Sequence, residues 1–280
     1  MTRLLTLGCS WMWGVGAEYD PDDPWDWREY KKKAHDENQW EYAFRTILSR
    51  KYGFQNVNLS GGGSSNSKQF RKLYRYLHSN TLDDTIVMVG VTSIYRMEMY
   101  FNHSKSYSCF QPGQILRPNV HGHDWCGAKE FFKQHFNEPR EKDSLAQQIW
   151  HWQHYFDLLG VPSIWFDMLN VNEYPNAGVY KPFDKLPYDC NQDMHSQLAY
   201  ENGWNPQDDK YHHSNWAADC DRIEHLKKTN IVNPYSFHPN RKGHQQMADM
   251  LDPILNKCYN TFKENNPNPR SYITNWKDVH

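Results

Sequence analysis

Four strand-like segments alternate with amphipathic segments along the chain, and this order constrains the fold more than any other feature. Each strand-like segment is short and largely apolar or β-branched; they read RLLTLGCS, FQNVNLS, TIVMVGVTS and VPSIWFDML. Parallel strands need a crossover about as long as a helix, so strands separated by helices pair in parallel. We therefore predict an α/β fold of three layers, α/β/α, with a parallel sheet of about five strands.

Apolar residues recur at helical spacing between these strands and after the last one. The periodic segments are ENQWEYAFRTILSRKYG, SKQFRKLYRYLHS, DSLAQQIWHWQHYFDLLG and PNRKGHQQMADMLDPILNKCYNTF. The period is lost over two stretches rich in Pro, Gly, His and aromatic residues. We interpret residues 1–280 as one domain with irregular insertions at about 100–140 and 170–235, and with a loose C-terminal tail from about residue 264.

Charge and hydropathy argue against two classes of partner. The chain has 31 Lys and Arg residues against 33 Asp and Glu residues, a net charge of −2, so no global basic field exists to hold nucleic acid. No apolar run approaches the roughly 20 residues that span a bilayer, and the opening MTRLLTLGCSWMWG is too quickly polar for a secretory signal. We expect a cytoplasmic protein with no nucleic-acid or membrane partner; the oligomeric state is open.

Cysteine and histidine spacing gives little support for a disulfide framework or a metal. The six cysteines contain no CxxC pair, which favours reduced thiols. Two histidine-rich stretches, HGHDWC at 121–126 and YHHSNWAADC at 211–220, could bind a metal if the two insertions met. Neither stretch has the spacing of a zinc module or of a metallohydrolase. We expect no metal and no cofactor.

Three turns that could carry chemistry follow the first three strands. They are Gly8-Cys9-Ser10, Ser60–Gly63 and Gly90–Ser93. Because parallel strands end at the same edge of a sheet, the turns should lie together there, where ligands of open α/β sheets bind. His238, just before the last helical segment, can reach the same edge. The sequence therefore predicts a site assembled from residues far apart in the chain.

These blocks resemble those of the SGNH (GDSL-type) hydrolase family. The family's first block is Gly-Asp-Ser, and the chain has Gly-Cys-Ser ending at Ser10; its second block supplies a glycine N–H, for which Gly63 in NLSGGGSSN is the best candidate. The third block, Gly-x-Asn-Asp, is similar to GVTS, with Thr92 in place of asparagine. The last block, Asp-x-x-His-Pro-Asn-x-x-Gly, is similar to YSFHPNRKG, which keeps His238 but has Tyr235 in place of aspartate. These departures resemble a divergent branch of the family among phage and bacterial sequences.

The resemblance implies a flavodoxin-like sandwich in which Ser10 is the nucleophile and His238 its base. The oxyanion hole would be formed by Ser10, Gly63 and Thr92. A serine hydroxyl is a weak nucleophile, so it needs an adjacent base and donors aimed at the developing oxyanion. Neighbouring residues at a strand end point to opposite sides, so only one of Cys9 and Ser10 can face the site, and the resemblance selects Ser10.

Two departures from the family pattern change the expected chemistry. The side chain of Thr92 is shorter than asparagine, so the hole could be weaker or could use Asn66 as well. Without an aspartate before His238, a backbone carbonyl, or an acid from the second insertion such as Asp219 or Asp221, would have to orient the ring.

Arg96, four residues after Thr92, is expected near the mouth of the site. A surface ion pair, for example with Glu98, is the commoner role for such an arginine. The alternative is a substrate-binding role, in which its guanidinium binds an anionic or carboxylate-bearing substrate.

Three functions fit the pattern. The first is a serine esterase or deacetylase that removes a small acyl group from a carbohydrate or similar polar ester through an acyl-serine intermediate. The second is an acyltransferase that uses the same site with an acceptor other than water. The third is a non-catalytic ligand-binding protein of the same fold, which the missing aspartate and the Thr92 substitution favour. Labelling by a fluorophosphonate probe separates the third from the first two.

Overall fold

Four parallel strands form the centre of the protein. The computed structural model describes residues 1–24, 26, 28–29, 37–101, 105–110, 134–169, 193–205 and 223–265. The strands are β1 (Arg3–Leu7), β2 (Gln55–Asn58), β3 (Thr85–Val91) and β6 (Ser163–Asp167), in the order β2-β1-β3-β6. All three pairings are parallel. The predicted α/β class and parallel sheet are confirmed, with four strands rather than five in the described part of the sheet.

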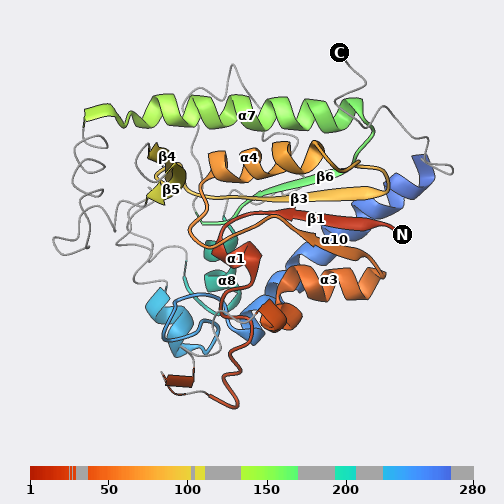
Figure 1. Ribbon diagram of the computed structural model, residues 1–280. Helices are drawn as coiled ribbons and strands as arrows, with labels where there is room; N and C mark the ends of the chain where they lie inside the picture. The colour runs from red at the N-terminus through yellow and green to blue at the C-terminus, as the bar shows by residue number, and fades with distance from the viewer. Residues whose placement is uncertain are drawn as a thin grey trace.

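Helices cover both faces of this sheet (Figure 1). On one face lie α3 (Phe44–Tyr52) and α10 (Arg241–Asn265), and on the other lie α4 (Asn66–Leu77) and α7 (Glu138–Leu158). The chain moves outward from β1 to β2, then crosses back over β1 to β3. Because crossovers keep one handedness, this reversal puts α3 and α4 on opposite faces. The carboxyl ends of β1 and β3 therefore lie next to each other where the winding changes direction.

The two layers of helices require a sheet that is apolar on both sides, and β3 shows this most clearly. All seven of its residues are buried. Ile86 and Met88 belong to the cluster beneath α3 and α10, whereas Val87, Val89 and Val91 belong to the cluster beneath α4 and α7. This alternation follows from the two-residue period of a strand.

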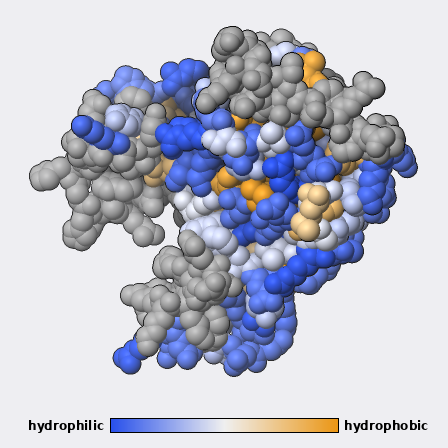
Figure 2. Space-filling model, turned by 45° about the vertical axis from the view of Figure 1, so that its right-hand side comes forward, coloured by the Kyte–Doolittle hydropathy of each residue, from blue (hydrophilic) through white to orange (hydrophobic). Residues whose placement is uncertain are grey.

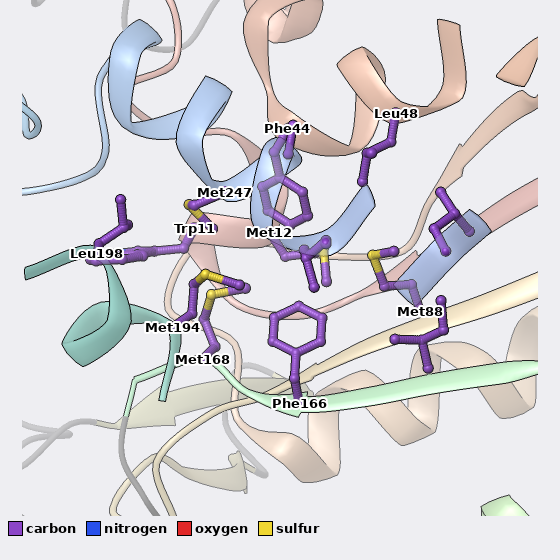
Figure 3. Packing of buried hydrophobic residues seen from close by; sticks show 14 of the residues in the cluster. Trp11, Met12, Phe44, Leu48, Met88, Phe166, Met168, Met194, Leu198 and Met247 are labelled. Carbon is purple, nitrogen blue, oxygen red and sulfur yellow. The ribbon is translucent and has the colours of Figure 1, made fainter. Parts of the chain in front are cut away.

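The residues directly after β1 are anchored in the first of these clusters. They form α1 (Ser10–Trp13), in which Met12 is fully buried and lies between Phe44 and Phe166 (Figure 3). Trp11 extends toward Leu198 of α8 (Met194–Glu201). The core therefore anchors the short helix that begins at Ser10.

The remaining elements lie partly in the stretches predicted to be irregular. A 3₁₀ helix, η1 (Glu37–Tyr42), precedes α3, and β4 (Met97–Phe101) pairs antiparallel with β5 (Ser106–Phe110). The β4–β5 hairpin and the first turn of α7 fall in or beside the insertion predicted at 100–140, and α8 falls in the one at 170–235. Hairpin pairing depends on contacts across the turn and leaves little trace in a short sequence window. The tail predicted from about residue 264 lies almost wholly outside the described residues.

Figure 2 shows a face on which hydrophilic residues predominate and hydrophobic residues form small patches. Within the described ranges, no helix combines the length and the apolar character needed to cross a membrane.

Truncation of a core leucine should destabilise the fold, whereas truncation of an exposed one should not. Leu73 of α4 is fully buried, and Leu158 at the end of α7 is 70% exposed. We expect Leu73→Ala to lower the free energy of unfolding by about 2–5 kcal/mol, because it leaves a cavity. Leu158→Ala should change it by less than about 0.5 kcal/mol. Urea unfolding followed by circular dichroism measures both, and equal effects would contradict the assigned packing.

Candidate active site

Ser10 lies at the carboxyl end of β1, as the first residue of α1. Cys9 occupies the N-cap position with extended backbone angles, and its side chain makes no capping hydrogen bond. The side chain of Cys9 is fully buried in the hydrophobic cluster, while Ser10 keeps 7% of its surface exposed. The two neighbours thus have different surroundings: Cys9 packs in the core and Ser10 reaches the edge of the sheet.

The Ser10 hydroxyl is hydrogen-bonded to His238, which is 228 residues away in sequence. The distance from Ser10 Oγ to His238 Nε2 is 2.7 Å. His238 Nδ1 lies 2.6 Å from the backbone carbonyl oxygen of Ser236. A carbonyl can only accept a hydrogen bond, so Nδ1 carries the proton and Nε2 is left to accept the proton of the serine. This tautomer is the one that a general base needs.

The group that orients His238 is therefore a backbone carbonyl, one of the two kinds considered from the sequence. A tight loop aims it: the Asn233 N–H donates to the His238 carbonyl at 2.8 Å, and the Phe237 N–H donates to the Asn233 carbonyl at 2.9 Å. The side chain of Asn233 accepts from the Tyr235 N–H at 2.8 Å. Phe237 has a φ of 58°, which is unusual for a residue with a bulky side chain. This turn brings the His238 ring back over the carbonyl of Ser236.

Gly16 allows the His238 loop to approach the chain after α1. Its φ is 93°, in the left-handed region that favours glycine. A Cβ added there would lie 2.5 Å from the Pro239 carbonyl oxygen and 3.1 Å from His238 Cβ. A larger residue would therefore push the loop outward, away from Ser10.

The residues after His238 fix the start of α10, and one expectation about them was wrong. The sequence predicts that Pro239 is the first helical residue, but the helix begins at Arg241. Pro239 instead forms an isolated bridge with Val232. Asn240 caps the helix, since its Oδ1 accepts from the Gly243 N–H at 3.0 Å. Pairing with Val232 competes with helix formation at Pro239, and a local window does not show that partner.

Gly63 presents its backbone to the same edge. It has a φ of 62°, and the turn that contains it is tied to the first strand by the Gly61 N–H, which donates to the Gly8 carbonyl at 3.2 Å. Among the described residues, the backbone N–H groups of Ser10 and Gly63 have no hydrogen-bond acceptor. Both N–H groups are therefore available to an oxyanion.

Asn66 and Thr92 form a reciprocal bridge between α4 and the end of β3. The Asn66 amide donates to the Thr92 carbonyl at 2.7 Å, and its Oδ1 accepts from the Thr92 N–H at 2.9 Å. The Thr92 side chain is fully buried, and its hydroxyl has no hydrogen-bond partner in the described part of the chain. Asn66 has a second amide hydrogen, so its side chain is the more accessible donor of the two.

Arg45 holds the far end of α1 and was not singled out from the sequence. Its Nε donates to the Met12 carbonyl and its Nη2 to the Trp13 carbonyl, both at 3.1 Å. The side chain is almost fully buried, and burial lowers the pKa of Arg45 to about 10. A cation near the carboxyl end of a helix is favourable, so Arg45 stabilises the short helix that begins at Ser10.

Burial strongly shifts the pKa values of His238, His244 and Glu18. Burial lowers the pKa of His238 to about 4, and the positive charge of Arg96 acts in the same direction, while the Ser236 carbonyl opposes both. Burial raises the pKa of Glu18 to about 7, although the backbone N–H groups of Glu18 and Gly16 act in the opposite direction. At pH 7 the ring of His238 is therefore neutral, as a proton acceptor must be.

Glu98, the expected partner of Arg96, is occupied by a different arginine. Arg71 of α4 binds Glu98 with both ends of its guanidinium fork, at 2.6 Å and 3.0 Å. Arg96 forms no ion pair with any described residue, and its buried Nη1 has no hydrogen-bond partner among them. The ion pair with Glu98 predicted as the commoner role is therefore wrong.

The remaining candidates from the sequence lie elsewhere. Asp219 and Asp221 and both histidine-rich stretches, 121–126 and 211–220, lie outside the described residues. In the described ranges, no group of three or more His, Cys, Asp or Glu residues could hold a metal. Cys9, Cys109 and Cys258 are free thiols.

Sequence reasoning missed Asn233 and Gly16, and it allowed for a backbone carbonyl beside His238 without indicating that Ser236 supplies it. Asn233-Pro234 is a turn-initiating pair and could have marked the His238 loop. A backbone acceptor such as the Ser236 carbonyl leaves no signal in residue identity, because every residue carries one.

Comparison with known proteins adds nothing to the geometry of the Ser10–His238 site. No family model matches the chain. No curated protein matches it.

The low pKa of His238 predicts how its ring titrates. The folded protein binds a proton at about pH 4, and the unfolded chain at the ordinary value of 6.5. The contribution of His238 to stability is thus present above pH 6.5 and is lost as the pH falls toward 4. We expect the His238 ring signal in NMR, assigned by its loss in His238→Gln, to remain that of a neutral imidazole at pH 6. A midpoint at or above 6.5 would refute the assigned surroundings.

Glu18 should show the opposite dependence. Its pKa is raised from 4.5 to about 7, so its contribution to stability is full below pH 4.5 and is lost as the pH rises through 7. Glu18→Gln mimics the protonated acid, so its free energy of unfolding should fall less between pH 5 and pH 8 than that of the wild type. Urea titrations at both pH values measure this. The exposed Glu264→Gln is the matched control and should follow the wild type.

Proposed function

We propose that this chain is a serine hydrolase of the SGNH type, an esterase or deacetylase that removes a small acyl group from a carbohydrate or similar polar ester. The observation that carries the proposal is the 2.7 Å hydrogen bond between Ser10 Oγ and His238 Nε2, with Nδ1 held by a backbone carbonyl. A nucleophile, a base and an orienting group in series are the geometry by which acyl-transfer sites are recognised.

The strand order gives further support. β2-β1-β3-β6 corresponds to the first four positions of the flavodoxin-like order 2-1-3-4-5, whose ligands bind at the switch point between the first and third strands. Ser10 follows β1 and Thr92 follows β3, so both lie beside that switch point, and His238 reaches it through its hydrogen bond to Ser10.

The proposed reaction begins when His238 Nε2 takes the proton from Ser10 Oγ as the oxygen attacks the ester carbonyl carbon. The negative charge that develops on the carbonyl oxygen is stabilised by the N–H groups of Ser10 and Gly63, with the second amide hydrogen of Asn66 as a further donor. His238 then gives its proton to the leaving alcohol. Water, activated by the same imidazole, hydrolyses the acyl-serine and regenerates Ser10.

The group bonded to His238 Nδ1 is a carbonyl and not a carboxylate, and this sets the character of the catalyst. The Ser236 carbonyl fixes the tautomer and the ring orientation, but it carries no full charge to stabilise the imidazolium. Arg96 adds a positive charge that opposes imidazolium formation. We therefore expect slow turnover on simple neutral esters, and we expect activity to persist at pH 5–6, where an ordinary histidine would be protonated.

Replacement of the nucleophile tests the proposal. Ser10→Ala should abolish hydrolysis of p-nitrophenyl acetate and labelling by a fluorophosphonate probe, with little change in melting temperature, because the site retains its packing around Met12. Ser79→Ala, which alters an exposed serine after α4, is the matched control and should keep both activities. If the wild type is neither labelled nor active, the ligand-binding alternative replaces the hydrolase.

Acyl transfer to an acceptor other than water uses the same acyl-serine. It is distinguished by an increase in p-nitrophenol release when a sugar or glycerol is added at constant ester concentration, together with the appearance of the acylated acceptor. A release rate and product set independent of added acceptor would leave hydrolysis as the reaction.

A further inference from the structure

Arg96 is a cation at the site whose charge is not balanced by any described residue. The arginine follows β3 in a turn closed by its own N–H, which donates to the Ser93 carbonyl at 3.1 Å. The next residue begins β4, and the β4–β5 hairpin lies at the carboxyl end of the sheet (Figure 1). The turn thus places Arg96 at the same edge as Ser10.

A buried guanidinium nitrogen without a hydrogen-bond partner is costly. Nη1 of Arg96 is buried without a hydrogen bond to any residue that the structure describes, and a buried polar group without a partner requires a physical explanation. The nearest acid in sequence, Glu98, is held in a two-point ion pair by Arg71, and its side chain is only 5% exposed. The local acid is therefore engaged by another cation, and no acid among the described residues pairs with Arg96, so its guanidinium can accept an external anion.

We infer that Arg96 binds an anionic group, a carboxylate or a phosphate, on the substrate itself, so that the preferred esters are negatively charged. The inference rests on the proposed function and specifies its substrate class. A guanidinium presents its N–H groups as a fork that matches the two oxygens of either anion, and such charge-assisted pairs are among the stronger hydrogen bonds.

The charge of Arg96 links this recognition to the chemical step. In the free site it opposes protonation of His238, which must become an imidazolium as Ser10 is acylated. An anion bound to Arg96 would offset that charge and make proton transfer to His238 easier. Anionic esters should thus have a higher kcat as well as a lower KM, whereas neutral esters should react more slowly.

Two pairs of esters that differ only in charge test the inference. 4-Nitrophenyl hydrogen succinate and its methyl ester place the charge on the acyl side. 4-Acetoxybenzoate and its methyl ester place it on the alcohol side. We expect wild type to prefer the charged member of at least one pair, and Arg96→Gln to lower kcat/KM for that member by about ten- to hundredfold. The neutral member should keep its rate or gain slightly, because removing Arg96 favours the imidazolium.

Matched variants separate charge recognition from structure. Arg96→Lys keeps the charge without the fork and should restore part of the preference. Arg75→Gln removes an exposed cation from the end of α4 and should leave both members of each pair unchanged. An equal loss on charged and neutral esters in Arg96→Gln would overturn the inference.

A binding measurement distinguishes failure of this inference from failure of the proposed function. Inorganic phosphate should raise the melting temperature of Ser10→Ala, with sodium chloride at equal ionic strength as the reference, and should raise it less in Ser10→Ala with Arg96→Gln. If the wild type is active but shows no charge preference, and if phosphate raises the melting temperature equally with and without Arg96, the proposed substrate class is wrong and the proposed function stands. Absence of labelling and hydrolysis overturns the proposed function and the substrate class together, whatever the phosphate shift, which then reports only an anion site.

Discussion

Burial of β3 on both faces is the constraint on which the rest of the structure depends. Every residue of this strand is buried, so the sheet needs a layer of helices on each side. Two layers are reached only if the winding direction reverses, and the reversal places the carboxyl ends of β1 and β3 side by side. The turn with Ser10 and the turn with Thr92 and Arg96 meet there for that reason. The same core anchors Trp11 and Met12, so the stability of the fold and the placement of Ser10 have a common source.

Among the described residues, the charges around Ser10 and His238 leave the proposed dyad without a negative group that would stabilise the imidazolium. Burial and the positive charge of Arg96 favour the neutral form of His238, and the Ser236 carbonyl that holds the ring opposes them only in part. That state suits the first proton transfer but disfavours the imidazolium that follows. A substrate with a negative charge of its own would stabilise the imidazolium. The proposed preference for anionic esters would thus compensate for the missing aspartate.

Much of the fold could be predicted from local patterns. The segments RLLTLGCS and TIVMVGVTS became β1 and β3 because short runs of apolar and β-branched residues suit a strand that is buried on both faces. SKQFRKLYRYLHS became most of α4 because its apolar residues recur at helical spacing. The hairpin of β4 and β5 was not predicted, since its strands depend on each other rather than on a period of their own. The start of α10 was misplaced at Pro239 because Val232, its bridge partner, is separated from it by a loop.

The sequence by itself determined the order of strands and helices, the turns that end the strands, and the choice of Ser10 and His238 as the residues to examine. Residue types and their spacing are local properties, and they suffice for these conclusions. Only the tertiary structure decided that the Ser236 carbonyl orients His238, that Gly16 admits the loop, and that Glu98 pairs with Arg71 instead of Arg96. The physical reason is that hydrogen bonds and ion pairs are selected by distances of a few ångströms between segments that the sequence separates, and those distances exist only once the core has packed.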